Sequence, residues 1–320
     1  MSLVSVIIPN YNHGRFLSER IDSILNQSFT EFECIVLDDA SNDNSKAIIE
    51  GYVTKDTRIK FYPFENNSGS PFVQWNRGVE LASNDLIWIA ESDDSCDTTL
   101  LQTLVNEHLK YPHIGLAYCQ SLKIDADSNI SGSWKDFTFN MDAELFNVNF
   151  IMDGMDFISN FLIHKNVIPN ASAVVFKKSV FGKAGGADVF LTTNSDWLCW
   201  LTMLVNHSVA FVPHPLNKFR FHSDSVIAKH KSFCSPIYKE QFDCSMRYRF
   251  ELWCKEQRVH LSAKILAVNQ QYISYDIGNR GLHLFRNGKW LNGLADIIKA
   301  SVFPQFTLGY VRRIFRRGNS

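Results

Sequence analysis

The chain has 320 residues, of which 45% are apolar, 13% aromatic and 20% charged, and its formal net charge is −1. This composition is typical of a folded globular protein and excludes a chain that is disordered throughout. The near-zero charge excludes a general nucleic-acid binder, and no stretch approaches the roughly 18 apolar residues that span a bilayer.

Apolar runs rich in β-branched residues alternate with amphipathic segments from residue 4 to residue 119. The runs predict five buried strands, at residues 4–8, 32–37, 59–62, 86–90 and 114–119. The segments between them predict helices at residues 16–25, 43–52, 71–81 and 98–109. This alternation is typical of an open α/β sheet flanked by helices, and such sheets bind ligands at the carboxyl ends of their strands.

The second half of the chain is less regular. Residues 123–150 show no clear period and are expected to form an irregular loop. Beyond them the pattern predicts a strand at 172–176, a helix at 194–205 and a strand at 209–212. After about residue 224 the chain becomes helical and basic. We therefore expect an α/β domain over residues 1–222 and a mainly helical, basic extension over residues 223–320.

Acidic side chains follow two of the predicted strands. Asp38 and Asp39 follow the second strand, and Glu91-Ser92-Asp93-Asp94 follows the fourth. Three acids in four residues repel one another unless a cation or several donors neutralise them. A hard divalent cation prefers oxygen ligands and often bridges a diphosphate. The alternatives are a helix cap at Asp38-Asp39 and an acidic turn that caps the helix starting near residue 98.

Three further side chains are candidates for chemistry. Asp196 begins a predicted helix, where it either stabilises the helix dipole or acts as a general base toward an attacking hydroxyl. Arg220 and His222 alternate with phenylalanines and so share one strand face. There Arg220 could clamp a diphosphate and His222 could hold a metal or a phosphate oxygen; the alternative is a surface strand with a satisfied histidine. P-loop, dinucleotide-binding, zincin and esterase motifs do not occur.

The seven cysteines are scattered along the chain, and no C-x-x-C pair occurs. We therefore expect reduced, mostly buried thiols rather than disulfides or structural zinc. The first apolar strand follows the initial methionine without a basic leader, which predicts no secretory signal. Together these features predict a cytoplasmic location.

Taken in order and at their spacing, these motifs resemble family-2 glycosyltransferases over roughly residues 3–225. The resemblance rests on Val4–Asn12, Ile24–Phe29, Glu33–Asp43, Asn76-Arg77-Gly78, Glu91–Asp94 and Ser195-Asp196-Trp197. It implies the GT-A fold and an inverting transfer of a sugar from a nucleoside diphosphate. It also implies a divalent metal, Mn²⁺ or Mg²⁺, and a saccharide or lipid-linked saccharide acceptor in bacterial cell-surface polysaccharide assembly.

The resemblance also implies roles for individual residues. The donor would lie against Pro9, Tyr11, Asp38, Asp39, Asn76, Arg77 and Asp93, joined by the candidate clamp Arg220. Asp39 would read the base, which favours UDP or dTDP. The metal would contact Asp94, Asp93 and Glu91, joined by the candidate ligand His222, and Asp196 would be the catalytic base. Glu91 replaces the family's usual first aspartate, and Ser195 replaces its usual glutamate. The segment 168–172 resembles that of one subgroup, without an assigned role.

Two other interpretations remain open. A non-catalytic module of the same fold would bind a nucleotide sugar without transferring it, but Asp94 and Asp196 argue against it because a binding module needs no base. A sugar nucleotidyltransferase normally carries a glycine-rich, basic segment near its N-terminus, and residues 9–14 lack that signature. Incubation with a sugar nucleotide and an acceptor extract would separate transfer, binding alone and pyrophosphate chemistry.

The end of the chain combines an apolar helical face with a basic terminus. Helical spacing places Trp290, Leu291, Leu294, Ile297 and Ile298 on one face. Four arginines follow, at positions 312, 313, 316 and 317. One interpretation is a helix packed on the main domain; the other is reversible attachment to an anionic membrane surface on its cytoplasmic side.

Overall fold

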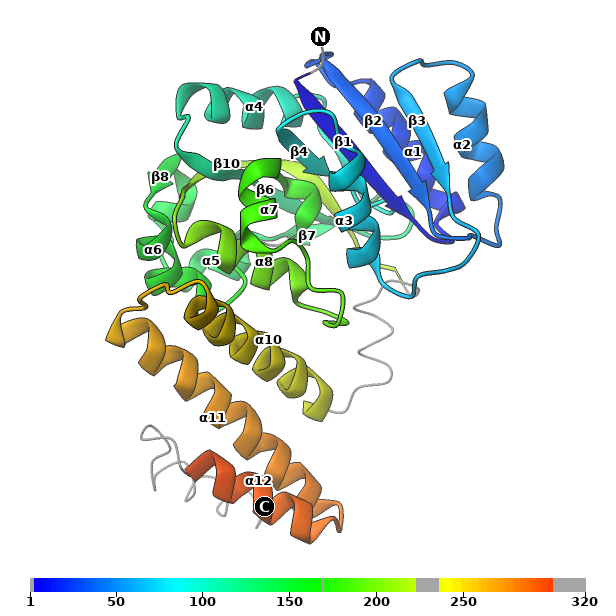
Figure 1. Ribbon diagram of the computed structural model, residues 1–320. Coiled ribbons are helices and arrows are strands. Elements are labelled where there is room, and N and C mark those ends of the chain that lie inside the picture. The colour runs from blue at the N-terminus through cyan, green and yellow to red at the C-terminus, as the bar shows by residue number, and fades with distance from the viewer. Residues whose placement is uncertain (1–2, 169, 223–235, 302–320) are drawn as a thin grey trace. The chain divides into compact units, whose positions relative to one another are not determined.

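The computed structural model describes residues 3–168, 170–222 and 236–301 (Figure 1). The chain divides into two compact units. The first comprises residues 1–157, 166–189 and 203–222, and the second comprises residues 158–165, 190–202 and 223–320. Within the described ranges, no helix combines the length and the apolar character needed to cross a membrane.

Ten strands form one mixed sheet in the first unit. They are β1 (Val4–Asn10), β2 (Phe32–Asp38), β3 (Ile59–Pro63), β4 (Leu86–Ile89), β5 (Ser95–Cys96), β6 (Ile114–Ile124), β7 (Ile130–Ser133), β8 (Phe150–Met152), β9 (Val174–Lys177) and β10 (Ser208–Arg220). Their order across the sheet is β3-β2-β1-β4-β9-β6-β10-β5, with β7 beside β6 and β8 beside β10. The expected open mixed α/β sheet is confirmed.

Six of these strands, including β3, which is parallel to β2, run in the same direction. β1 is parallel to β2 and β4, and β6 is parallel to β10. β9 is antiparallel to both β4 and β6, so β4 and β6 also share a direction. The carboxyl ends of β1, β2, β4, β6 and β10 therefore lie along one edge of the sheet, which is where such sheets bind ligands.

Helices cover both faces of this sheet. They are α1 (Gly14–Leu25), α2 (Ser45–Val53), α3 (Pro71–Leu81), α4 (Leu100–Lys110), α5 (Lys135–Phe139), α6 (Gly154–Phe157) and α7 (Lys178–Ala184). Val6 and Ile8 of β1 pack with apolar side chains of α1, α2 and α4 in one buried cluster. Ile7 points to the opposite face, where α3 packs so closely that a Cβ on Gly78 would lie 2.3 Å from Ile7 Cγ2.

The segment 123–150 is more regular than expected, so the prediction of an irregular loop is wrong. β6 continues to Ile124, and the chain then forms β7, α5, a short 3-10 helix and β8. β7 has the sequence ISGS and pairs with β6 alone. Half of its residues are exposed, so an apolar core does not stabilise this strand. Its backbone pairing with β6 does. Similarly, the predicted strand at 209–212 extends to Arg220.

The second unit is helical in its described residues. A π-helical turn at Ile158–Leu162 and the start of α8 (Ser195–Leu204) belong to it, with α10 (Pro236–Glu256), α11 (Ala263–Arg286) and α12 (Trp290–Ser301). α11 and α12 pack closely, because a Cβ on Gly281 would lie 2.8 Å from the carbonyl oxygen of Gly293.

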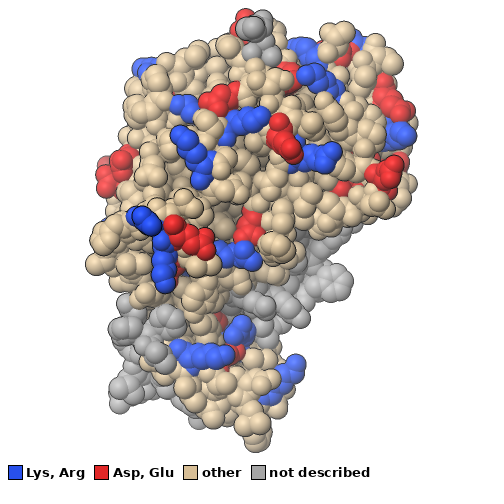
Figure 2. Space-filling model, viewed as in Figure 1, with Lys and Arg blue, Asp and Glu red and all other residues tan. Residues whose placement is uncertain are grey.

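Surface charge is mixed on the face of the molecule drawn in Figure 2. Lysine and arginine side chains lie among aspartate and glutamate side chains there, as the near-zero net charge leads one to expect.

Candidate active site

Polar side chains from the ends of three strands lie at the carboxyl edge of the sheet. Asp38 ends β2, the acidic turn Glu91–Asp94 follows β4, and Arg220 ends β10. The two-residue strand β5, which directly follows the acidic turn, pairs antiparallel with β10 at Asn217 and Lys218. This pairing brings the acidic turn beside the end of β10, although the two are more than a hundred residues apart in sequence.

His13, Asp93 and His222 form a cluster that could hold a metal ion. One possible ligand atom from each residue lies within 4.8 Å of the other two. His222 Nε2 is 3.0 Å from an Asp93 carboxylate oxygen, and His13 Nδ1 is 2.8 Å from the hydroxyl oxygen of Ser92. Imidazole nitrogen is a common ligand of divalent transition metals, and carboxylate oxygen suits Mn²⁺, so the residues present can hold a divalent transition-metal cation such as Mn²⁺.

The charges of the acidic turn are not equivalent. Burial raises the pKa of Asp93, but the hydrogen bond from His222 and the charges of His13 and His222 outweigh it, so this pKa lies below its ordinary value. Burial and the neighbouring Asp93 raise the pKa of Glu91 to about 8 and that of Asp94 to about 7. Asp93 is therefore the member of the turn that most readily carries a negative charge at neutral pH.

Asp94 makes its hydrogen bonds within the protein. The backbone N–H of Arg220 donates to one of its oxygens at 2.9 Å, and Asn170 Nδ2 donates to the other at 2.7 Å. Asn170 Oδ1 in turn accepts hydrogen bonds from Asn217 and from the backbone N–H of Ala173. Asp94 thus ties the acidic turn to β10 and to the segment that precedes β9, and its contact with a metal remains a prediction.

Glu91 is likewise engaged by the protein. Trp75 Nε1 of α3 donates a hydrogen bond of 2.8 Å to its carboxylate, and its backbone N–H donates to the Ser172 hydroxyl. Behind the turn, the fully buried guanidinium of Arg20 lies 5.1 Å from the ring of Trp88. Its positive charge opposes the effect of burial on the pKa of Glu91 and Asp94. The predicted metal contact of Glu91 also stays untested.

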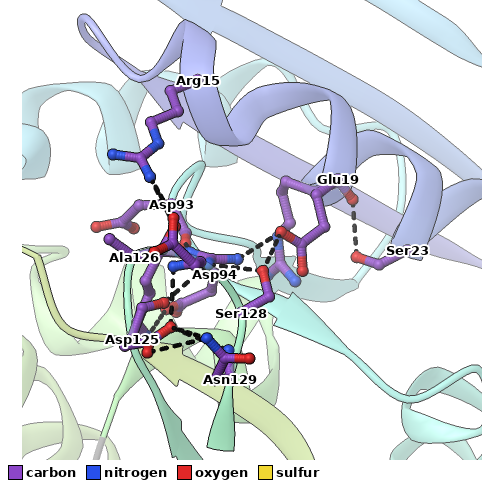
Figure 3. A network of polar contacts seen from close by, with 12 residues as sticks. Arg15, Glu19, Ser23, Asp93, Asp94, Asp125, Ala126, Ser128 and Asn129 are labelled. Atoms are coloured by element: carbon purple, nitrogen blue, oxygen red, sulfur yellow. Dashed lines mark hydrogen bonds and ion pairs between the residues drawn. The ribbon is translucent and has the colours of Figure 1, made fainter.

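The Arg220 guanidinium contacts Glu19, Asp93, Asp125 and Ser128, which Figure 3 labels. Its Nε donates to the Asp93 carbonyl at 2.6 Å, Nη1 donates to the Asp125 carbonyl and the Ser128 hydroxyl, and Nη2 pairs with Glu19 at 2.6 Å. The side chain is only 1% exposed. Its predicted contact with a diphosphate stays a prediction, whereas its observed contacts hold the acidic turn against α1 and the β6–β7 loop.

Asp38 and Asp39 anchor two loops. Asp38 accepts hydrogen bonds from the backbone N–H and the hydroxyl of Ser41. Asp39 accepts hydrogen bonds from the backbone N–H and hydroxyl of Ser68 and, at 2.6 Å, from Gln74 Nε2. Both aspartates are 4% exposed. They therefore fix the loops after β2 and before α3, which border the same edge of the sheet.

The other predicted donor contacts lie around these loops. Pro9 is buried in β1, whereas Tyr11 is 42% exposed just beyond it. Asn76 donates to the carbonyl of Ala187 and accepts from its N–H, both at 2.8 Å, and Arg77 beside it is exposed. Tyr11 and Arg77 are thus accessible to a ligand, while Asn76 binds the chain itself.

Asp196 belongs to the second unit. It is half-buried in the first turn of α8, directly after the buried Ser195. Asn194, which precedes the helix, adopts a left-handed φ of 64°. The structure thus bears out the predicted position of Asp196 at a helix start.

Sequence reasoning missed His13 and gave Asn170 no role. His13 lies in the loop after β1, two residues after Tyr11, which the resemblance placed against the donor, so its proximity to Tyr11 was an available signal. Asn170 lies in the segment 168–172, which resembled that of one subgroup, but its contact with Asp94 spans 76 residues and leaves no local pattern.

Comparisons with known proteins place these observations in a family. A model described as Glycosyl transferase family 2 matches residues 5–167. Glycosyltransferase GlyG of Streptococcus pneumoniae is 32% identical over 155 residues, 48% of this chain and 45% of that protein. The GalNAc(5)-diNAcBac-PP-undecaprenol beta-1,3-glucosyltransferase of Campylobacter jejuni is 30% identical over 153 residues, 48% of each chain. The chain spans about half the length of these curated relatives.

Solved structures share the fold. S. aureus TarS 1-349 in complex with UDP-GlcNAc gives a TM-score of 0.64 at 17% identity, over 93% of this chain and 81% of that one. Mannosyltransferase PcManGT from Pyrobaculum calidifontis, in complex with GDP-Man and Mn2+, gives 0.57 at 15% identity, over 98% and 83%. At these identities the likeness shows the fold, and it confirms the expected GT-A architecture.

Proposed function

Because the chain belongs to glycosyltransferase family 2, we propose that it transfers a sugar from a nucleoside diphosphate to a saccharide or lipid-linked saccharide acceptor with inversion. The observation that carries this proposal is the His13–Asp93–His222 cluster at the carboxyl edge of the sheet. Its donor set suits a divalent cation, and the edge is where open α/β sheets bind nucleotides.

The cluster residues would hold the cation, and their two imidazoles favour Mn²⁺ over Mg²⁺. When bound, the cation neutralises the negative charge that builds on the departing diphosphate. Asp93 supplies the anionic ligand, because its pKa is held below the ordinary value. Arg220 keeps the Asp93 backbone in place through its 2.6 Å hydrogen bond to the carbonyl.

For the donor, we propose that Pro9, Tyr11 and the loops anchored by Asp38 and Asp39 hold the nucleoside. The Asp39 carboxylate would accept a hydrogen bond from an N–H group of the base. A base without that N–H would bind more weakly by roughly 1–3 kcal/mol. The preferred donors are therefore uridine or thymidine diphosphate sugars. The solved relatives in complex with UDP-GlcNAc and GDP-Man support a nucleotide-sugar donor in general.

A thermal-shift panel tests the donor site. UDP, dTDP, GDP and ADP are each added with and without Mn²⁺, and binding to the folded state raises the melting temperature. We expect the largest shift from UDP or dTDP, and a larger one when Mn²⁺ is present. Equal shifts with ADP would contradict the base preference, and no shift with any nucleotide would contradict the donor site.

For the acceptor, we propose that Asp196 is the general base. It takes the proton of the acceptor hydroxyl while that oxygen bonds to the anomeric carbon and the bond to the diphosphate oxygen breaks. Asp196→Asn should retain sugar-nucleotide binding and lose transfer, because the missing interaction belongs to the transition state. Lost donor affinity with unchanged turnover would make Asp196 a positioning group instead.

We also propose that the second unit attaches reversibly to an anionic membrane surface. α12 buries Gly293, Asp296 and Ala300 and exposes larger apolar side chains: Trp290 by 66%, Leu291 by 85%, Leu294 by 49% and Ile298 by 56%. An exposed apolar helix face of this kind suits the interfacial region of a bilayer. The arginines at 312, 313, 316 and 317, which the sequence suggested as partners for anionic lipid, lie outside the described residues.

Liposome co-sedimentation tests the attachment. Vesicles containing anionic lipid are mixed at low and high salt with the full chain, with a chain truncated after residue 303, and with Leu291→Ser/Leu294→Ser. We expect the truncation to remove the salt-dependent part of vesicle binding. The double variant should weaken the part of vesicle binding that does not depend on salt. Leu109→Ser, which alters an exposed leucine of α4, is the matched control. Binding that neither change affects would contradict the proposal.

A further inference from the structure

Asp196 is flanked by two residues that α10 holds. Asn194 lies two residues before it and Trp197 lies one residue after it. Asp243 and Arg247 of α10 are four residues apart and so project from the same face of that helix. Asp243 accepts a hydrogen bond from Asn194 Nδ2, and Arg247 lies over the ring of Trp197.

The Trp197 side chain is held by a hydrogen bond at the edge of its ring and by a cation over the face of its ring. Its indole N–H donates to the Leu162 carbonyl at 2.8 Å. The Arg247 guanidinium lies 5.0 Å from the centre of the ring, and its Nη1 donates to the next carbonyl along the chain, that of Ile163, at 2.8 Å. Two consecutive carbonyls of one turn thus hold the ring and the cation that packs on it.

Arg247 is in turn held by α11. Its guanidinium lies 4.4 Å from the centre of the Tyr272 ring, and its Nη1 also donates to Asn269 Oδ1 at 3.1 Å. Arg247 is 2% exposed and Asn269 is fully buried. A cation–π contact stabilises more when it is buried than when it is exposed. Moving the Arg247 guanidinium away would also leave the Ile163 carbonyl and Asn269 Oδ1 without this donor.

The backbone that enters α8 is constrained as well. Asn194 has a left-handed φ of 64°, which is uncommon for a residue with a side chain, and its carbonyl accepts the first hydrogen bond of the helix, from the Leu198 N–H. Its side-chain hydrogen bond to Asp243 supports this conformation. The residues on both sides of Asp196 are therefore held by one helix face.

We infer that Arg247, together with Asp243, positions Asp196: the C-terminal helices fix the first turn of α8 and so the direction of the Asp196 carboxylate. The inference rests on the proposed role of Asp196 as the base. A general base must lie within hydrogen-bonding distance of the proton that it takes, and a displacement of about 1 Å can lower the rate on the order of a hundredfold. The C-terminal helices thus contribute to turnover although they touch no reacting atom.

The test compares turnover with donor affinity in Arg247→Met, Arg247→Lys, Asp196→Asn and the double variant Arg247→Met/Asp196→Asn. We expect Arg247→Met to lower kcat by about 10- to 100-fold with unchanged donor Kd, and Arg247→Lys to recover part of the loss because a cation remains over the rings. The double variant should be no slower than Asp196→Asn, since both act on one group. Lys255→Met, which alters an exposed cation of α10, should match the wild type.

If Arg247→Met does not fold, Asn194→Gly carries the test. Glycine adopts the left-handed conformation freely and removes only the hydrogen bond to Asp243, so kcat should fall by roughly tenfold with donor affinity unchanged. Wild-type kcat in folded Arg247→Met, or in Asn194→Gly where the first does not fold, would overturn the inference. Full turnover in Asp196→Asn would instead overturn the role of Asp196, and the two failures are thereby distinguished.

Discussion

The buried guanidinium of Arg220 joins the acidic turn to α1 and to the β6–β7 loop. Arg220→Met would remove the hydrogen bonds to the Asp93 carbonyl and the Ser128 hydroxyl and the ion pair with Glu19, which keeps a hydrogen bond from Ser128. Breaking a buried charge pair of this kind typically costs several kcal/mol. Because Glu19 is 40% exposed and water can solvate it, we expect the free energy of unfolding to fall by about 3 kcal/mol, measured by urea denaturation.

Arg15→Met is the matched control for this prediction. Arg15 also pairs with a carboxylate, that of Asp127, but the two side chains are 63% and 74% exposed. Exposed pairs contribute about 0–1 kcal/mol, so this variant should be nearly neutral. A loss in Arg220→Met no greater than that in Arg15→Met would contradict the assigned role of Arg220.

The partners of the individual acids in the turn after β4 could not be predicted from the sequence. The motif Glu91-Ser92-Asp93-Asp94 indicated a charged site, but not which acid faces which partner. Successive side chains diverge, so Asp93 meets His222 while Asp94 meets Asn170. Their partners come from segments far away in the sequence, and the local charge pattern does not predict which distant residues lie beside each acid.

At the scale of elements, α3 packs on the sheet through Gly78. A methyl group there would lie 2.3 Å from Ile7 and 2.9 Å from a side-chain carbon of Leu37. Overpacking a dense core costs about 1–3 kcal/mol, so Gly78→Ala should lower the free energy of unfolding by that amount. Gly51→Ala is the control, because a Cβ at Gly51 of α2 meets nothing within 4 Å, and alanine there should be neutral or stabilising. Equal effects of the two variants would refute the close packing.

The contact of α4 with β9 makes the fold sensitive to acid. His108 Nε2 donates to the Val175 carbonyl at 2.9 Å, and burial lowers the pKa of His108 to about 4. As the pH falls below about 6.5, the unfolded chain takes up a proton that the folded chain refuses until about pH 4. Folding stability is therefore lost across this window, by about 2 kcal/mol between pH 7 and pH 5.

His108→Gln isolates this contribution. Glutamine keeps an N–H donor for the Val175 carbonyl but does not titrate. Urea unfolding of both chains at pH 7 and pH 5 should show a loss in the wild type that exceeds the loss in the variant by about 2 kcal/mol. The same loss in both chains would show that His108 does not control the acid sensitivity.

Most elements of the first half could be predicted from sequence. β1, β2 and β4 are buried on both faces, so their apolar runs are nearly continuous. β5 and β7 could not be predicted, because one has two residues and the other is mostly polar. Their positions depend on pairing with β10 and β6, and pairing partners distant in sequence leave no local pattern.

For the whole molecule, the parallel strands explain why the candidate site could be located in outline. Acids and amides that follow parallel strands must meet at one edge of the sheet, and the sequence placed them after the correct strands. The His13–Asp93–His222 cluster and the support of Asp196 by α10 both required the tertiary structure. The first depends on the pairing of β5 with β10, and the second on α10 meeting α8 in the second unit.

The proposed function is a metal-dependent transfer that uses Asp93. The measurement is the release of nucleoside diphosphate from the preferred sugar nucleotide, in the presence of an acceptor extract, followed against Mn²⁺ concentration. We expect release by the wild type to require Mn²⁺ and to stop in excess EDTA. Asp93→Asn should be slower by about 10²-fold or more, and Asp127→Asn, an exposed acid near the site, should behave as the wild type. Full release in EDTA, or by Asp93→Asn, would contradict the claim.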